Sequence, residues 1–128
     1  MTEETAKKRI LVVDDDPGIV RFLEASLHAA GFEVAKCYNG QEALAAVKQS
    51  LPDLIILDRM MPKMDGLKTC ALIKADRRFR GIPVIMVTAS ADAADERLSA
   101  QVKVDAFINK PINIPELMRK VEELIVRV

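Results

Sequence analysis

Five polar residues come directly after apolar stretches of the sequence, and their types could together bind a metal ion. Asp14 and Asp15 follow one apolar run, Asp58 follows a second, and Thr88 and Lys110 follow two more. Two carboxylates about 4 Å apart repel by roughly 4 kcal/mol at an effective dielectric constant near 20, so three in one site need a cation. Lys110 supplies one positive charge, and an oxygen-only set of ligands suits Mg²⁺.

The apolar runs before these residues predict the strands that would bring them together. Short unbroken apolar runs are typical of strands that are buried on both faces of a parallel sheet. One further segment alternates between apolar and polar residues, as a more exposed strand does. The five predicted strands are residues 10–13, 32–37, 54–58, 83–87 and 105–109.

Five helices are predicted to follow the strands. Asp16, Asp65 and Asn113 are suitable N-caps, and Pro17 stands at the first helical position, where proline is well tolerated. The fourth helix has a thin apolar face, so we expect it to be the least firmly held element. Asn39 and Gly40 form a turn or cap, and the second helix follows them, is marked by Ala43, Leu44 and Val47, and ends near Gln49. The other predicted helices cover residues 17–30, 66–75, 92–102 and the segment after Asn113.

Strands that alternate with helices predict the α/β fold class, with a parallel sheet, right-handed crossovers and helices on both faces. We expect the strand order 2-1-3-4-5, which places the most apolar strands inside a flavodoxin-like, doubly wound (βα)5 three-layer sandwich. The carboxyl ends of parallel strands share one edge, so the five polar residues would gather there. Residues 1–8 are predicted to be a polar tail, and residues 9–128 one domain.

Composition narrows the function classes. The chain has 128 residues, of which 50% are hydrophobic and 30% charged, a balance typical of a globular domain. Its 19 basic and 19 acidic residues cancel, so net charge predicts no attraction to nucleic acid or to a membrane. No apolar run has the length of a membrane span, and the polar N-terminus lacks the apolar core of a signal peptide. We therefore expect a cytoplasmic protein.

The cysteines and the histidine predict no site of their own. Cys37 and Cys70 lack the spacing of a redox motif, and a single histidine leaves no zinc constellation. We expect both cysteines to be small buried apolar side chains. His28 lies in the middle of the first predicted helix and should face solvent.

Four segments together resemble one known family. They are ILVVDDDP (residues 10–17), LDRMMPKMDG (57–66), PVIMVTA (83–89) and NKP (109–111). In this order and at this spacing, they make the sequence similar to the receiver domain of two-component response regulators along essentially the whole chain. The resemblance implies that Asp58 accepts a phosphoryl group from a phosphohistidine on a sensor histidine kinase or a histidine phosphotransfer domain.

The resemblance also implies how the site is completed. Asp14 and Asp15 would hold Mg²⁺, with help from the Asp58 carboxylate and the backbone carbonyl of Met60. Lys110 would pair with Asp58 and then with the phosphoryl oxygens.

Two further residues would form the switch. Thr88 would move to hydrogen-bond the phosphoryl group, and Phe107 would occupy the switch aromatic position. The surface of the fourth helix, fifth strand and fifth helix would then regulate a downstream protein or an attached output domain. The family implies a bacterial signalling switch rather than an enzyme, although it catalyses its own phosphorylation and dephosphorylation. It allows a phosphorylation-dependent dimer, and we expect this segment to contact neither nucleic acid nor a membrane.

Three residues depart from the family pattern. Phe107 stands where the family often has tyrosine, so it offers no hydroxyl to a partner. Lys103 stands where many members have glycine, so its turn either differs or holds a lysine at positive φ. Arg59 is an unusual charge beside Asp58, and we expect it to be a surface residue.

Three other functions fit parts of this sequence. An aspartate-nucleophile phosphatase of the haloacid dehalogenase type needs a second acid two residues after the nucleophile, where this chain has Met60. A flavodoxin-like cofactor binder needs a glycine- and hydroxyl-rich phosphate loop, whereas three aspartates follow the first strand. A pseudo-receiver that binds partners without phosphorylation is the alternative that stays open. We expect either a stand-alone receiver or a piece of a longer regulator or hybrid kinase.

Overall fold

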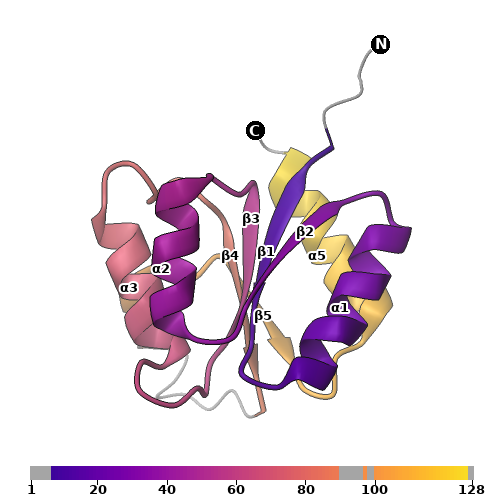
Figure 1. Ribbon diagram of the computed structural model, residues 1–128, viewed down its shortest axis with the longest axis horizontal. Coiled ribbons are helices and arrows are strands. Elements are labelled where there is room, and N and C mark those ends of the chain that lie inside the picture. Colours follow the sequence, from indigo (N-terminus) through magenta and orange to yellow (C-terminus); the bar gives the residue numbers. More distant parts are fainter. Residues whose placement is uncertain (1–6, 90–96, 98–99, 127–128) are drawn as a thin grey trace.

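The computed structural model describes residues 7–89, 97 and 100–126, and these form a parallel sheet with helices on both sides (Figure 1). The strands are β1 (Arg9–Val13), β2 (Glu33–Cys37), β3 (Leu54–Asp58), β4 (Val84–Thr88) and β5 (Ala106–Asn109). The helices are α1 (Pro17–Ala29), α2 (Gly40–Gln49), α3 (Gly66–Ala75) and α5 (Ile114–Val126).

The sheet has the predicted topology. Its strand order is β2-β1-β3-β4-β5, and every neighbouring pair of strands is parallel. Helices α2 and α3 cover one face of the sheet, and α1 and α5 cover the other (Figure 1). The predictions of fold class, strand order and three layers are confirmed.

Alternate residues of the central strands supply two separate hydrophobic cores, because successive side chains of a strand point to opposite faces. Leu11 and Val13 of β1 belong to the core under α2 and α3. Ile10 and Val12 belong to the core under α1 and α5. This burial on both faces explains why β1, β3 and β4 are continuous apolar runs in the sequence.

The predicted N-caps are confirmed. The Asp16 carboxylate accepts a hydrogen bond from the Gly18 N–H at 2.8 Å, and Pro17 is the first residue of α1. Asp65 caps α3 and Asn113 caps α5 in the same way, with donor–acceptor distances of 2.8 and 2.9 Å. Helix α2 begins at Gly40, and Asn39, predicted as part of a turn or cap, caps it.

Two predictions concern the segment before β5. Most of the predicted fourth helix, residues 92–96 and 98–99, lies outside the described residues, as does the expectation that it is loosely held. Arg97 and residues 100–102 are helical. Lys103 then has a φ of 65°, so the expectation of a lysine at positive φ is confirmed.

Among the residues that the structure describes, no helix combines the length and apolar character that crossing a membrane requires.

Candidate functional site at the carboxyl edge of the sheet

The sheet brings the ends of four strands together along one edge. Asp58 is the last residue of β3 and pairs in register with Val87, next to the Thr88 that ends β4. Asp14 follows β1, and its N–H donates to the Cys37 carbonyl at 3.2 Å. Lys110 follows β5, and its N–H donates to the Thr88 carbonyl at 2.8 Å. The strand register therefore places these groups as neighbours.

Three carboxylates meet at this edge. Asp14, Asp15 and Asp58 each offer an oxygen atom, and the three atoms lie within 4.8 Å of one another. Asp14 and Asp58 are only 2% and 3% exposed, whereas Asp15 is exposed. Two buried acids beside one open acid make a site that an ion can enter from solvent.

Lys110 lies between the two buried carboxylates. Its Nζ is 3.2 Å from Asp58 Oδ1 and 3.6 Å from Asp14 Oδ2. The lysine side chain is partly exposed and points into the acidic cluster rather than into bulk water. The sequence-based prediction that these three groups lie within reach of one another therefore agrees with the geometry.

The candidate site holds more negative charge, from three carboxylates, than the single Lys110 ammonium can neutralise. Burial raises the pKa of Asp14 to about 6, although the Asp16 N–H, which donates to its carboxylate at 2.9 Å, opposes the shift. Burial also raises the pKa of Asp58, despite the hydrogen bond and charge of Lys110. Burial lowers the pKa of Lys110, but the carboxylates of Asp14 and Asp58 outweigh it and the net shift is upward. One ammonium is therefore not enough to balance three carboxylates.

The donor set fits a hard divalent cation. All three candidate ligands are carboxylate oxygens, which suit Mg²⁺, and an ion that keeps several water molecules needs few protein ligands. A divalent charge would also offset the repulsion by Asp58 and Asp15, which adds to the effect of burial on the pKa of Asp14. Met60, the fourth predicted ligand, has an exposed side chain, and its N–H donates to the Asp58 carboxylate.

The two predicted switch residues lie on adjacent strands. Thr88 is buried at the end of β4. Phe107 is half-buried in β5 and packs against the core under α2 and α3, while its carbonyl accepts a hydrogen bond from Lys120 Nζ of α5 at 2.7 Å. Their roles as switch residues stay predictions.

Arg59 differs from its prediction as a surface residue. Its side chain is 16% exposed, and Nη1 lies 3.3 Å from Asp65 Oδ2. The pattern of residue types did not indicate this ion pair, because the partners are joined only by the path of the loop between β3 and α3. The one sequence signal was the presence of opposite charges at the two ends of that loop.

The remaining candidates carry no chemistry at this edge. Cys37 and Cys70 are buried, as predicted, and burial raises the pKa of each thiol to about 11. His28 is exposed on α1, also as predicted.

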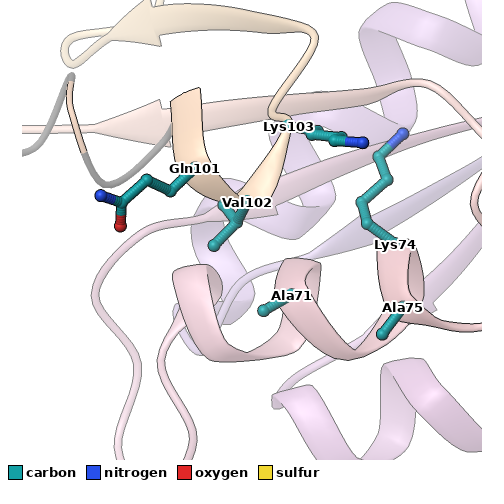
Figure 2. A pocket seen from close by; sticks show the side chains of 6 residues that line it. All are labelled: Ala71, Lys74, Ala75, Gln101, Val102 and Lys103. Carbon is teal, nitrogen blue, oxygen red and sulfur yellow. The ribbon is translucent and has the colours of Figure 1, made fainter.

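A separate cavity of about 220 Å³ lies between α3 and the turn before β5 (Figure 2). Lys74 of α3 lines it, but its ammonium is already satisfied by the Ile82 carbonyl at 2.7 Å and by Asp105 Oδ2 at 2.9 Å. None of the acidic residues of the candidate site lines this cavity, whose walls are Ala71, Lys74, Ala75, Gln101, Val102 and Lys103.

Comparison with known proteins agrees with the geometry of the carboxyl edge. Residues 10–122 match the family model of the response regulator receiver domain. The chain belongs to this family. That assignment confirms the resemblance found in the sequence motifs.

This receiver domain is similar in sequence to curated response regulators. The chain is 39% identical over 118 residues to the DNA-binding response regulator MtrA of Mycolicibacterium smegmatis, covering 92% of this chain and 50% of MtrA. The chain spans about half the length of the curated relatives it matches.

Two solved structures are similar in fold. The chemotaxis protein CheY4 of Vibrio cholerae superposes with a TM-score of 0.89 at 27% identity, covering 93% of this chain and 99% of CheY4. A signal receiver domain of a signal transduction histidine kinase from Syntrophus aciditrophicus has the same TM-score at 36% identity, covering 94% and 92% of the two chains.

Proposed function

We propose that this receiver domain takes a phosphoryl group onto Asp58 in an Mg²⁺-dependent reaction. The donor would be a phosphohistidine of a sensor histidine kinase or of a histidine phosphotransfer domain. The observation that supports this most strongly is the position of Lys110 Nζ, 3.2 Å from a buried Asp58 carboxylate that shares its edge with two further acids.

The transfer would proceed by in-line displacement. An oxygen of Asp58 forms a bond to phosphorus while the bond from phosphorus to the imidazole nitrogen breaks. The nitrogen keeps the electron pair, and Asp58 becomes an acyl phosphate. A carboxylate is a weak nucleophile toward an anionic donor, so the rate depends on positioning and charge neutralisation.

The residues around Asp58 have the chemistry for these tasks. The Lys110 ammonium would hold Asp58 before transfer and a phosphoryl oxygen afterwards. Asp14 and Asp15, with Asp58 and the Met60 carbonyl, would bind Mg²⁺, which would neutralise charge on the transferred group. The Thr88 hydroxyl would donate to the phosphoryl group.

Phosphorylation would then act as a switch. The product adds roughly −1.5 to −2 charge at the carboxyl ends of β4 and β5. Thr88 and Lys110 are the groups there that can respond to this charge. We propose that residues 92–102, β5 with Phe107, and α5 form the surface that regulates a partner or an attached output domain, in a cytoplasmic protein. We propose that this segment contacts neither nucleic acid nor a membrane.

The proposal is tested by incubating the protein with Mg²⁺ and acetyl phosphate and measuring its intact mass. Wild type should gain the mass of one phosphoryl group, and Asp58→Ala should gain none. Asp76→Asn, which alters a half-buried carboxylate outside the site, serves as the matched control and should be phosphorylated like wild type. A mass gain in Asp58→Ala, or none in wild type, would contradict the proposal and favour a pseudo-receiver.

A further inference from the structure

Arg59 joins the end of β3 to the start of α3 through both its backbone and its side chain. Its carbonyl accepts a hydrogen bond from the Gly66 N–H at 2.9 Å. Its guanidinium Nη1 lies 3.3 Å from Oδ2 of Asp65, the residue that caps α3. Its own N–H donates to the Val87 carbonyl of β4 at 2.8 Å. Two contacts, one of the backbone and one of the side chain, therefore join the two ends of the loop at residues 60–65.

This loop controls two groups of the candidate site. It begins with Met60, whose carbonyl is a proposed metal ligand and whose N–H donates to the Asp58 carboxylate. A loop whose ends are joined samples fewer conformations than an open one, so its closure limits where the carbonyl and the carboxylate point. Met64 N–H, which donates to the Pro62 carbonyl at 2.8 Å, restricts the loop further.

We propose that Arg59 is a positioning residue for the phosphoryl-transfer site. By pairing with Asp65, its guanidinium holds the loop at residues 60–65 in the conformation that lets the Met60 carbonyl and the Asp58 carboxylate serve one divalent ion. This inference rests on the proposed function and deepens it. Exposed ion pairs contribute little, but the Arg59 side chain is only 16% exposed, so this pair is shielded from solvent on one side.

Charge alone and positioning make opposite predictions for Arg59→Met and the same prediction for Asp65→Asn. Arg59→Met removes a positive charge near the site, so charge alone would strengthen Mg²⁺ binding. Asp65→Asn removes a negative charge, so charge alone would weaken it. Asparagine still caps a helix, and therefore the start of α3 is kept. If the contact between the two residues positions the loop, both substitutions weaken Mg²⁺ binding.

The test is a calorimetric titration of each variant with MgCl₂. We expect Arg59→Met and Asp65→Asn each to raise the Mg²⁺ dissociation constant about fivefold, the upper end of what an ion pair near the surface contributes. The charge-neutral double variant should be no weaker than the single variants, because one contact is lost in all three. Opposite effects of the two single substitutions, additive effects in the double variant, or unchanged affinities would overturn the inference.

Controls separate loop positioning from folding and from the proposed function. Lys36→Met breaks an ion pair with Glu24 on the α1 and β2 surface, where the two charged atoms are 3.1 Å apart, and should leave Mg²⁺ binding unchanged. Thermal unfolding without Mg²⁺ reports whether each variant is folded, and Arg59→Gln replaces Arg59→Met if the latter is not. If wild type neither binds Mg²⁺ nor gains a phosphoryl group, the proposed function fails. If wild type does both and Arg59 variants match it, only this inference fails.

Discussion

The carboxyl group of Asp14 lies in an environment that strongly perturbs its pKa. It is buried beside Asp58, and its pKa is raised to about 6 mainly by burial. Its carboxylate also accepts the Asp16 N–H at the start of the α1 turn, so the same side chain serves the loop and the site. A protonation change at Asp14 therefore affects both.

We predict a specific pH dependence of stability in the absence of divalent ions. Asp14 binds a proton more tightly in the folded protein than at its ordinary pKa of 3.8. The protonated carboxyl group therefore contributes its full amount to the free energy of unfolding below pH 4, and this contribution is lost as the pH rises through 6. The loss is roughly 3 kcal/mol if the whole shift is expressed, at about 1.4 kcal/mol per pKa unit. The free energy of unfolding of Asp14→Asn, measured with urea in EDTA, should therefore increase relative to wild type between pH 4 and pH 7.

Asp76→Asn is the control for that measurement. Hydrogen bonds from Arg78 hold the pKa of Asp76 at about 2, so this carboxylate stays ionised in the folded protein over the same range. Its difference from wild type should not change between pH 5 and pH 7. An Asp14→Asn curve parallel to that of wild type would show that burial does not perturb Asp14.

The sequence predicted the site residues that end a strand, but not those that depend on the path of a loop. Asp58, Thr88 and Lys110 each lie at the end of a predicted strand. A parallel sheet brings the carboxyl ends of its strands to one edge, whatever the conformations of the loops that connect them. The pairing of Arg59 with Asp65 depends instead on how the intervening residues turn. Residue spacing in the sequence does not determine that turn.

At the scale of elements, the junction between β3 and α3 is the tightest backbone contact near the site. A Cβ atom on Gly66 would overlap the Asp58 carbonyl oxygen and lie 2.9 Å from the Cα of Arg59. Both neighbours are backbone atoms, which cannot turn aside as a flexible side chain can. The start of α3 can approach β3 this closely only with glycine at this position.

We therefore predict that Gly66→Ala lowers the free energy of unfolding by about 1–3 kcal/mol, as overpacking does elsewhere, and weakens Mg²⁺ binding by displacing Asp58. Gly81→Ala is the matched control, because nothing lies within 4 Å of the Cβ it would add. Urea unfolding of both variants tests this. Equal stabilities of the two variants would mean that the β3–α3 junction can relax.

The bounds of the strands were predictable where an unbroken apolar run marked them. β1, β3 and β4 come from unbroken apolar runs. β3 has the predicted bounds, and each end of β1 and β4 lies within one residue of its predicted position. The start of α2 was indicated by Asn39 and Gly40 as a turn or cap, because the first turn of the helix, from Gly40 to Glu42, has no apolar periodicity.

At the scale of the whole molecule, a chain with no net charge concentrates three carboxylates at one edge of its sheet. We predict that Mg²⁺ stabilises the folded chain, since the unfolded chain does not assemble this cluster. At a concentration one hundred times the dissociation constant, the free energy of unfolding should rise by about 2.7 kcal/mol.

Thermal unfolding with increasing MgCl₂ at pH 7 measures this stabilisation. Asp15→Asn is the informative variant, because Asp15 is exposed and its loss should weaken the response to Mg²⁺ without unfolding the protein. Lys36→Met should respond like wild type. An equal rise in wild type and Asp15→Asn would place the ion elsewhere.

Separate sets of contacts hold the residues at the two ends of β5. Asp105 accepts hydrogen bonds from Lys74 Nζ and from the Val84 N–H, and its own N–H donates to the Val84 carbonyl. At the other end of the strand, Lys110 is held by the Thr88 carbonyl and by the carboxylates of Asp58 and Asp14. Under the proposed function, a phosphoryl group on Asp58 would change the contacts of Lys110 and leave those of Asp105 in place, so β5 would respond first at the end that leads into α5.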